Sequence, residues 1–527
     1  MEVRLMEKEF TVTGTCTPDE NYMVDISSKL EEIKALVDKK NYFTINRGRQ
    51  YGKTTVLTAL ETYLEDEYIV ISLTFEDLGD ESFVDAKTFC QALLKNIADA
   101  LEFTNVSEEY RESWKDELII SFDLLSDHIK KMCKGKKVVL MIDEVDKVSN
   151  NRVFLNFLSV LRKKFLARKK KRDETFHSVI LAGVYDIKNI KLKMINDGIY
   201  TPAKSENHLR NSPWNIAVDF DVDMSFNPVE IATMLIDYEK DYQTGMDVSA
   251  ISGEIYSYTS GYPFMVSRLC QIIHDEAKGW DVYGVRFAVS LFLREDNQLF
   301  KDMAKNIENN KQLYELLYSI IILRYRVSFT FDDPLLDMAY RYGYIKFDNR
   351  YTVSVFNKIF ETRISYYFVA KNILSKPRQK TNAMYHNIAT VDYFNMELCL
   401  EKFAEFFNKE IFPIKEKKLL EEQYRLSFLS FLKPLLNGEG HFHQESELIN
   451  DTRMDLVVNY GRHEYIVELK RIFAESDRTK GIEQLLGYME GRNADVGYYL
   501  TFDFRKKSKS NVQWLEFDGK RIFEVSV

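Results

Sequence analysis

Proline and cysteine are scarce in this sequence, and each scarcity excludes a class of protein. Nine prolines in 527 residues, with no long low-complexity tract and no repeat of fixed period, argue against flexible tethers and favour packed domains with short connections. The five cysteines stand singly, without a C-x-x-C pair. The sequence therefore offers no disulfide framework and no zinc motif, and it fits a reducing compartment.

Long apolar runs are missing too. No stretch approaches 18 uncharged apolar residues, and the first ten residues, MEVRLMEKEF, lack the apolar core of a signal peptide. We therefore expect a cytoplasmic protein without a membrane partner. At 527 residues the chain is longer than one core can fill, so three or four domains are expected.

An excess of positive charge is also absent. The formal net charge is -9, so the chain as a whole does not indicate nucleic-acid binding. Two local runs, residues 161–172 and 503–510, are strongly basic. Either run could contact phosphate backbones, or it could form a solvated helix face or loop.

The stretch INRGRQYGKTTVL, residues 45–57, is close to the phosphate-binding pattern G-x-x-x-x-G-K-[ST]. In that pattern, glycine amides, a lysine and a hydroxyl bind a nucleoside triphosphate and its magnesium. Gly52, Lys53 and Thr54 fit, but Arg47 stands where the first glycine is expected.

The flanks of this loop have the periodicities that a phosphate loop requires. The residues before it, NYFTI, alternate as in a short strand. After it, Val56, Leu57, Leu60 and Leu64 share one face of a predicted helix, whose free N-terminal amides favour an anion.

A second element of a nucleotide site follows in KKVVLMIDEVDKV, residues 136–148. Its apolar run predicts a buried parallel strand with Asp143 and Glu144 at the carboxyl end, where ligands bind in open α/β sheets. We expect Asp143 to hold magnesium and Glu144 to polarise the water that attacks the γ-phosphate.

Two further strands are predicted at residues 67–77 and 177–187, the second beside the phosphate-loop strand. Tyr185 and Asp186 at its end are either nucleotide-sensing residues or a plain turn. Later, Pro263 leads into a helix that carries Arg268, which is either a sensor arginine or a surface residue.

The run RGRQYGKT resembles the R-P-R-R-F-G-K-[ST] loop of the bacterial "AAA-ATPase-like" family, whose members often carry a C-terminal PD-(D/E)xK nuclease-like domain. Arg47 and Arg49 match arginines of the family pattern, Tyr51 matches its aromatic residue, and Gly48 replaces its proline. The resemblance covers nearly the whole chain. It implies ATP and Mg2+ as cofactors, with Thr54 and Asp143 holding the metal. The implied nucleotide-binding residues are Arg47, Gly48, Arg49, Gln50, Tyr51, Gly52, Lys53, Thr54, Thr55, Asp143 and Arg268.

The middle of the chain is predicted to be a connector. Residues 226–305 have a helical pattern, with Asn227 as a cap before Pro228. Two helices and two short strands joined at FDNR, residues 347–350, then suggest a winged helix. Such a domain either binds DNA or regulates the nucleotide domain. Because its helix PLLDMAYRYG offers only Arg341 as a basic group, we favour regulation.

The last third carries a second constellation of charged residues. MDLVVNY and EYIVELKRIF read as two strands joined by a turn at Gly461. Alternation puts Glu468 and Lys470 on one face with Leu469 opposite, and Asp455 opens the partner strand.

An acid followed by E-x-K on a strand is typical of PD-(D/E)xK nucleases. Asp455 and Glu468 would hold magnesium, and Lys470 would orient water or neutralise charge at phosphorus. Exposed strands also carry E-x-K for solubility, but other features favour the nuclease-like reading. Gln484 and Tyr488 lie one helical turn apart, as in related nucleases, and the segment TRMD resembles the usual lead-in with Thr452 in place of a glycine. Glu445 or Glu422 supplies an upstream acid, and VGYYLTFDF reads as a further core strand.

The sequence thus predicts an α/β multidomain protein. It would have a P-loop AAA-like ATPase core with a parallel sheet (1–225), a helical lid (226–305), a winged-helix-like connector (306–370) and a mixed α/β PD-(D/E)xK nuclease-like domain (371–527). The predicted function is an ATP-hydrolysing switch coupled to a magnesium-dependent DNA nuclease, and this domain pairing suggests defence against phage or mobile DNA. The alternatives are a regulatory nucleic-acid-binding ATPase with an inactive nuclease-like domain and a pure ATP-dependent motor. An arginine finger, for which Arg210 is a candidate, would require a homo-oligomer.

Overall fold

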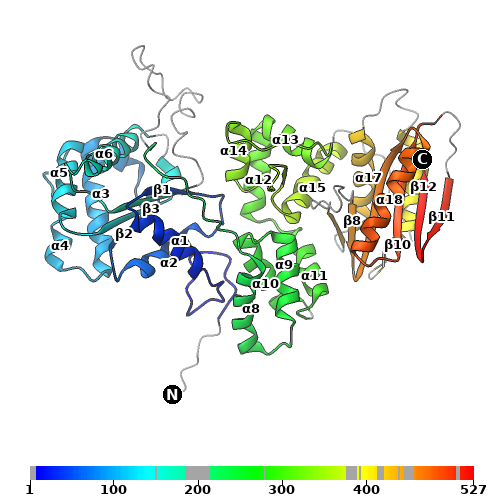
Figure 1. Cartoon of the computed structure of the whole chain (residues 1–527), viewed down its shortest axis with the longest axis horizontal. Helices are drawn as coiled ribbons and strands as arrows, with labels where there is room; N and C mark the ends of the chain where they lie inside the picture. The colour runs from blue at the N-terminus through cyan, green and yellow to red at the C-terminus, as the bar shows by residue number, and fades with distance from the viewer. Residues whose placement is uncertain are drawn as a thin grey trace, which may run out of the picture. The chain divides into compact units, whose positions relative to one another are not determined.

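The structure is a computed structural model of the chain (Figure 1). It describes residues 8–148, 151–183, 214–277, 279–374, 388–390, 393–411, 421–436, 440–443, 456–505 and 511–527. The chain forms two compact units. The first extends to Ser225, and the second comprises Glu9–Val12 and Phe226–Val527.

A four-stranded parallel sheet forms the centre of the first unit, in the order β1-β4-β3-β2. Its strands are β1 (Tyr42–Asn46), β2 (Ile69–Thr74), β3 (Val138–Asp143) and β4 (Ser178–Gly183). Every residue of β1, β3 and β4 is buried, as expected for a parallel sheet covered on both faces. The predicted parallel sheet is confirmed, and so is the position of β4 beside β1.

Helices cover both faces of this sheet (Figure 1). On one face, α3 (Ala86–Ala100), α5 (Phe122–Cys133) and α6 (Arg152–Lys169) share a core with alternate residues of the strands. On the other face, α2 (Lys53–Leu64) contacts β2, β3 and α1 (Ser27–Asp38). The predicted inner face of α2 is confirmed, because its four apolar residues are all buried.

The second unit begins with five helices. They are α8 (Pro228–Tyr242), α9 (Val248–Thr259), α10 (Pro263–Glu276), α11 (Val282–Phe292) and α12 (Gln298–Asn309). Asn227 caps α8 as predicted, accepting from the Glu230 amide while the Glu230 carboxylate accepts from the Asn227 amide. Before α10, Gly261 has φ +72, and a Cβ there would lie 1.8 Å from the Phe226 carbonyl oxygen. Only glycine fits this turn.

Two more helices and a hairpin follow. They are α13 (Lys311–Ile321), α14 (Pro334–Arg341), β5 (Ile345–Phe347) and β6 (Val353–Val355), with the two strands antiparallel. The predicted turn between the strands is confirmed, and Asp348 closes it by accepting from the amides of Arg350 and Thr352. On α14 the Nε of Arg341 donates to Asp337 at 2.9 and 3.0 Å. Helix α15 (Lys358–Leu374) comes next.

The C-terminal part contains a six-stranded mixed sheet in the order β11-β12-β10-β9-β8-β7. Its strands are β7 (Gly440–His443), β8 (Leu456–Tyr460), β9 (His463–Ile472), β10 (Val496–Asp503), β11 (Asn511–Phe517) and β12 (Lys520–Ser526). The predicted β8–β9 hairpin and the core strand β10 are confirmed. The accompanying helices are α16 (Met396–Phe406), α17 (Glu421–Leu436) and α18 (Glu475–Gly491), of which α18 contacts β9 and β10.

Polar contacts join this sheet to the helices that precede it. Ser290 on α11 bonds His441 on β7 at 2.9 Å, and Arg286 pairs with Glu464 at 3.3 Å. The Thr362 hydroxyl on α15 donates to the Phe442 carbonyl at 3.1 Å. In the described parts of the chain, no helix is long and apolar enough to cross a bilayer.

Candidate functional site

The candidate nucleotide site lies at the carboxyl end of β1, where residues 47–52 connect that strand to α2. Gly52 has φ +74, a conformation that glycine adopts without strain, and Gln50 has φ +55. Tyr51 is buried and anchors the loop, whereas Arg49 and Gln50 are exposed. The loop thus leads into the N-terminus of α2, whose free amides suit a phosphate group.

Lys53, the first residue of α2, folds back over the loop. Its Nζ donates to the carbonyl oxygens of Arg47 at 3.1 Å and Gly48 at 3.0 Å. The side chain is only 7% exposed, and this burial lowers the pKa of Lys53, an effect that the carboxylates of Asp146, Glu144 and Asp143 oppose. The lysine is therefore held at the loop by acceptors that phosphate oxygens can replace.

Thr54 and Asp143 meet across the sheet edge. The Thr54 hydroxyl donates to Oδ2 of Asp143 at 2.6 Å, although 89 residues separate the two. Asp143 ends β3, which β4 separates from β1. A hydroxyl and a carboxylate oxygen at this spacing form a donor set that fits Mg2+, which prefers one or two protein oxygens together with substrate phosphates.

Glu144 occupies a strained backbone conformation, with φ +55. Its amide donates to Oδ1 of Asp143 at 2.8 Å, so Asp143 orients both Thr54 and the residue that follows it. Burial raises the pKa of the Glu144 carboxyl, and the charge of Lys53 opposes that shift. The structure thus brings Lys53, Thr54, Asp143 and Glu144 together, as the sequence predicted.

Arg47 has a structural role that the motif did not indicate. Its guanidinium donates to the carbonyl oxygens of Asn46 at 2.9 Å and Val222 at 3.3 Å, and its amide donates to Gly183 O at 3.2 Å. The arginine therefore ties the loop to the end of β4 and to the segment that closes the first unit. Of the remaining predicted loop residues, Thr55 lies close enough to Cys16 to lower the pKa of that thiol, against the larger effect of burial, which raises it.

Asp146 is a site residue that the sequence analysis missed. It lies in η3 (Val145–Val148), close enough to Lys53 to raise the pKa of that lysine. A Cβ on Gly183 would lie 2.3 Å from Oδ1 of Asp146, so this carboxylate packs against the end of β4. The sequence did carry a signal for this residue, because Asp146 is a third acid only two positions after Glu144.

The other predicted contributors to this site lie in other parts of the chain, and their roles stay predictions. Tyr185, Asp186 and Arg210 lie outside the described part of the chain. Arg268 lies on α10 in the second unit, where its guanidinium pairs with Glu295 at 2.7 Å and bonds Gln271.

The second candidate site is built from β9 and α18. Glu468 is 1% exposed on the face of β9 that α18 covers, and Lys470 lies two residues further along the same face. The Lys470 ammonium donates to Oε1 of Gln484 at 3.4 Å, and Nε2 of Gln484 donates to the Tyr488 hydroxyl at 3.0 Å. The structure thus joins Lys470, Gln484 and Tyr488 in one chain of hydrogen bonds.

Part of the predicted nuclease constellation lies outside the described residues, namely Asp455, Thr452 and Glu445, whereas Glu422 lies near the start of α17. Within the described ranges, no group of three or more His, Cys, Asp or Glu side chains is arranged to hold a metal ion. The sequence analysis also missed a bidentate ion pair on this sheet, in which Arg478 of α18 donates to Glu524 of β12 at 2.7 and 2.5 Å.

The basic run 161–172 is partly used inside the fold. Lys164 is 1% exposed and pairs with Asp173 at 2.9 Å. Arg168 donates to the carbonyl oxygens of His177 at 2.8 Å and Lys40 at 2.7 Å. Neither side chain is available as a surface charge. In the second run, Arg505 pairs with Asp503, and residues 506–510 lie outside the described part of the chain.

Residues 20–281 match the family model of an AAA-like domain. The Walker-type ATPase of Pyrococcus abyssi aligns with a TM-score of 0.45 and 11% identity, over 67% of this chain and 99% of the other. The ORC2 protein of Aeropyrum pernix in ADPNP-ADP complexes aligns at 0.36 and 11%, over 66% and 97%. Drosophila ORC bound to DNA aligns at 0.30 and 14%, over 64% and 94%. No curated protein matches the chain. The chain therefore contains an AAA-like domain, and this domain includes the phosphate loop and the acids at the end of β3.

Proposed function

We propose that this chain is an ATP-hydrolysing switch whose C-terminal domain is a magnesium-dependent nuclease acting on DNA. The observation that carries the ATPase part is the 2.6 Å hydrogen bond between Thr54 and Asp143, with Lys53 and Glu144 beside it. These are the groups that hold a nucleoside triphosphate, its metal and the attacking water in a P-loop ATPase.

Each residue has a separate task in this proposal. The α2 amides and the Lys53 ammonium would bind the β- and γ-phosphates, and Thr54 and Asp143 would hold a Mg2+ ion, which would supply positive charge to the phosphate oxygens. Glu144 accepts a proton from the water whose oxygen bonds to the γ-phosphorus as the bond to the bridging oxygen breaks. The raised pKa of Glu144 favours this proton transfer.

The ATPase proposal is tested by turnover of Mg-ATP. Lys53→Ala should abolish hydrolysis, because no other ammonium group at the loop can replace it. Glu144→Gln should bind ATP without hydrolysing it. Normal turnover in either variant would contradict the role assigned to that residue in ATP hydrolysis.

The nuclease part is supported by Glu468 and Lys470 on one face of β9, with Gln484 and Tyr488 from α18 bonded beside them. In this proposal Asp455 and Glu468 hold Mg2+, whose chemistry is to polarise the phosphodiester, and Lys470 orients the attacking water. Purified protein should then nick plasmid DNA only when a divalent metal is present.

The alternative is a regulatory ATPase whose nuclease-like domain binds nucleic acid without cutting it. Metal-dependent nicking by the wild type distinguishes the two proposals, since the alternative predicts binding without cleavage. A pure motor would unwind DNA with DNA-stimulated hydrolysis and would not cleave it.

The domain division and the coupling complete the proposal. Residues 226–305 would act as the nucleotide lid, with Arg268 as its sensor arginine, and residues 306–370 as a winged helix. The Arg341–Asp337 pair supports a regulatory winged helix rather than a DNA-reading one, because the basic group of α14 is already bonded to an acid. A homo-oligomer and a role in defence against phage or mobile DNA belong to the same proposal.

A further inference from the structure

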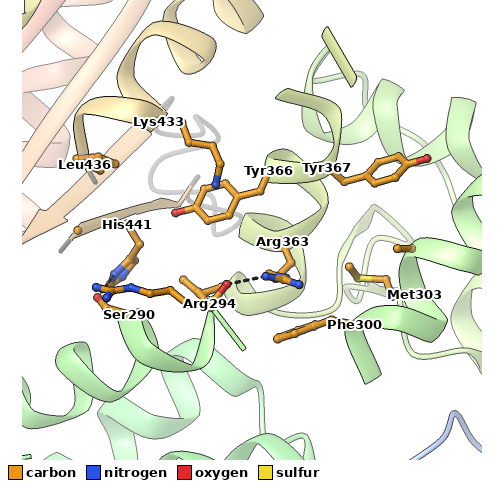
Figure 2. Close-up of a pocket in the computed structure, with 13 residues that line it drawn as sticks. Ser290, Arg294, Phe300, Met303, Arg363, Tyr366, Tyr367, Lys433, Leu436 and His441 are labelled. Carbon is orange, nitrogen blue, oxygen red and sulfur yellow. Dashed lines mark hydrogen bonds between the residues drawn. The ribbon is translucent and has the colours of Figure 1, made fainter. Parts of the chain in front are cut away.

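The second unit contains a cavity of about 410 Å³ outside both candidate sites. It lies where α11, α12 and α15 meet α17 and β7 (Figure 2). This volume is within the range of about 300–1,000 Å³ that is usual for small-molecule sites.

The charged side chains around this cavity are all cationic. Arg294, Arg363 and Lys433 contribute to its lining, and none of the described lining residues is an aspartate or a glutamate. His441, which also lines it, stays neutral, because burial lowers the pKa of His441 to about 3. Its Nδ1 is engaged with the Ser290 hydroxyl at 2.9 Å. The cavity therefore has a positive potential that no lining acid balances.

Lys433 and Arg363 are half-buried, and neither forms an ion pair among the described residues, although the charges of Asp296 and Glu295 act on Arg363 from nearby. The amino group of Lys433 lies over the Tyr366 ring, as Figure 2 shows, and burial lowers the pKa of Lys433 to about 7. The Arg363 guanidinium lies 4.3 Å from the centre of the Phe300 ring and donates to the Leu293 carbonyl oxygen at 2.7 Å. Burying a cation without a counter-ion is costly, and an anionic ligand would remove that cost.

The rest of the lining suits a planar apolar group. Phe300 and Met303 of α12 and Tyr366 and Tyr367 of α15 contribute to it, and Leu436 of α17 adds an aliphatic surface (Figure 2). Aromatic faces beside guanidinium and ammonium groups bind a flat ring together with an attached anion. An inorganic anion alone would leave this apolar part of the wall unused.

We propose that this cavity binds a small phosphorylated compound with a planar ring, of the mononucleotide class, with Arg294, Arg363 and Lys433 around its phosphate. The ligand would contact the helices α11, α12 and α15 and also α17 and β7 of the C-terminal domain. It would therefore stabilise the contact between these two parts of the second unit. This site is separate from the phosphate loop and does not depend on the proposed ATPase or nuclease activity.

The test is isothermal titration of the full chain with 5′-AMP, in a Lys53→Ala background that removes the phosphate-loop lysine. Adenosine and inorganic phosphate serve as probes of the ring and of the anion alone. We expect 5′-AMP to bind more tightly than either probe. Lys433→Met and Arg363→Met should each weaken binding about tenfold or more, the loss of one charge-assisted contact. Lys311→Met is the matched control, because Lys311 lies on α13, is exposed and pairs with Glu315, so binding should be unchanged.

Several results would overturn the proposal. The first is that 5′-AMP does not bind. The second is that the wild type and the Lys433 and Arg363 variants bind 5′-AMP equally well. The third is that inorganic phosphate binds while 5′-AMP does not. A 5′-phosphorylated oligodeoxynucleotide that binds through Lys433 while 5′-AMP does not would also overturn it, in favour of a nucleic-acid end. If Lys433→Met does not fold, Arg294→Met takes its place, because Arg294 is exposed and its loss leaves no gap in the core.

Discussion

The Thr54 hydroxyl donates a 2.6 Å hydrogen bond to Oδ2 of Asp143, joining the first turn of α2 to the end of β3. The other carboxylate oxygen of Asp143 accepts from the Glu144 amide at 2.8 Å. One aspartate thus orients a hydroxyl of the phosphate loop and the backbone of the proposed catalytic base.

Thr54→Val should lower Mg-ATP turnover at least about tenfold, because it removes an oxygen that holds the metal and orients Asp143. Turnover should be measured over a range of magnesium concentrations, and the variant should need more metal for half-maximal rate. Thr58→Val is the matched control, since the Thr58 hydroxyl lies on the same helix and donates only to the Thr54 carbonyl. Equal losses in the two variants would show that the Thr54 hydroxyl has no special role.

Glu144→Gln should reduce turnover at least about 100-fold while leaving ATP affinity close to that of the wild type, because only proton acceptance is lost. Rate and affinity are measured separately, by phosphate release and by nucleotide titration. Glu76→Gln is the control: Glu76 is exposed, and its charge acts on Glu144 from nearby. Unchanged phosphate release in Glu144→Gln would exclude this residue as the base.

Lys470→Ala should reduce metal-dependent DNA nicking at least about 100-fold, because the ammonium that orients water or neutralises charge is lost. Glu468→Gln should have a similar effect through the metal. Lys480→Ala, which removes an exposed lysine of α18, should leave nicking unchanged. Cleavage by Lys470→Ala at the wild-type rate would contradict the assignment of Lys470 to the active site, whereas no metal-dependent nicking by the wild type would favour the non-cleaving alternative.

The stability of the second unit should fall as the pH falls below neutrality. Burial lowers the pKa of His441 to about 3 in the folded state, whereas the unfolded value is near 6.5. Between these values the unfolded chain binds more protons, so stability is full above about pH 6.5 and is lost as the pH falls towards 3. This histidine should account for ~2 kcal/mol of the loss between pH 7 and pH 5.

The measurement for this prediction is the free energy of unfolding as a function of pH. His441→Gln should make the dependence shallower, with the share of the buried His443, whose pKa burial also lowers, remaining. His463→Gln should leave the dependence unchanged, because His463 is exposed. Parallel curves for the wild type and His441→Gln would contradict the assignment.

Gly261→Ala should destabilise the second unit by at least ~2 kcal/mol. The alanine would combine a φ of +72 with a Cβ placed 1.8 Å from the Phe226 carbonyl oxygen. Gly253→Ala is the matched control on α9. A Cβ there meets nothing within 4 Å, so the helix should gain ~0.5–1 kcal/mol. Urea unfolding of both variants gives the comparison, and a neutral Gly261→Ala would contradict the packing described here.

Sequence periodicity predicted the elements that depend on local pattern. The inner face of α2, the buried strand β3, the Asn227 cap and the β8–β9 hairpin all follow from residues close together in the chain. Their sidedness is set by alternation or by a helical repeat, which a single sequence displays.

Contacts between distant segments could not be predicted in the same way. The bond from Arg47 to the Val222 carbonyl spans 175 residues, and the Arg478–Glu524 pair spans 46. The basic run at 161–172 suggested surface charge, but Lys164 finds Asp173 in the fold. The cationic cavity has no sequence signal, because Arg363 and Lys433 come from two separate helices and Arg294 comes from the turn after α11.

The measurement that tests the central claim most directly is steady-state phosphate release from Mg-ATP by the wild type and by Lys53→Ala, with folding of both checked by circular dichroism. We predict turnover by the wild type that requires magnesium, and none above background in the variant. Turnover that survives loss of the Lys53 ammonium, or a folded wild type that releases no phosphate, would contradict the assignment of this site as an ATPase.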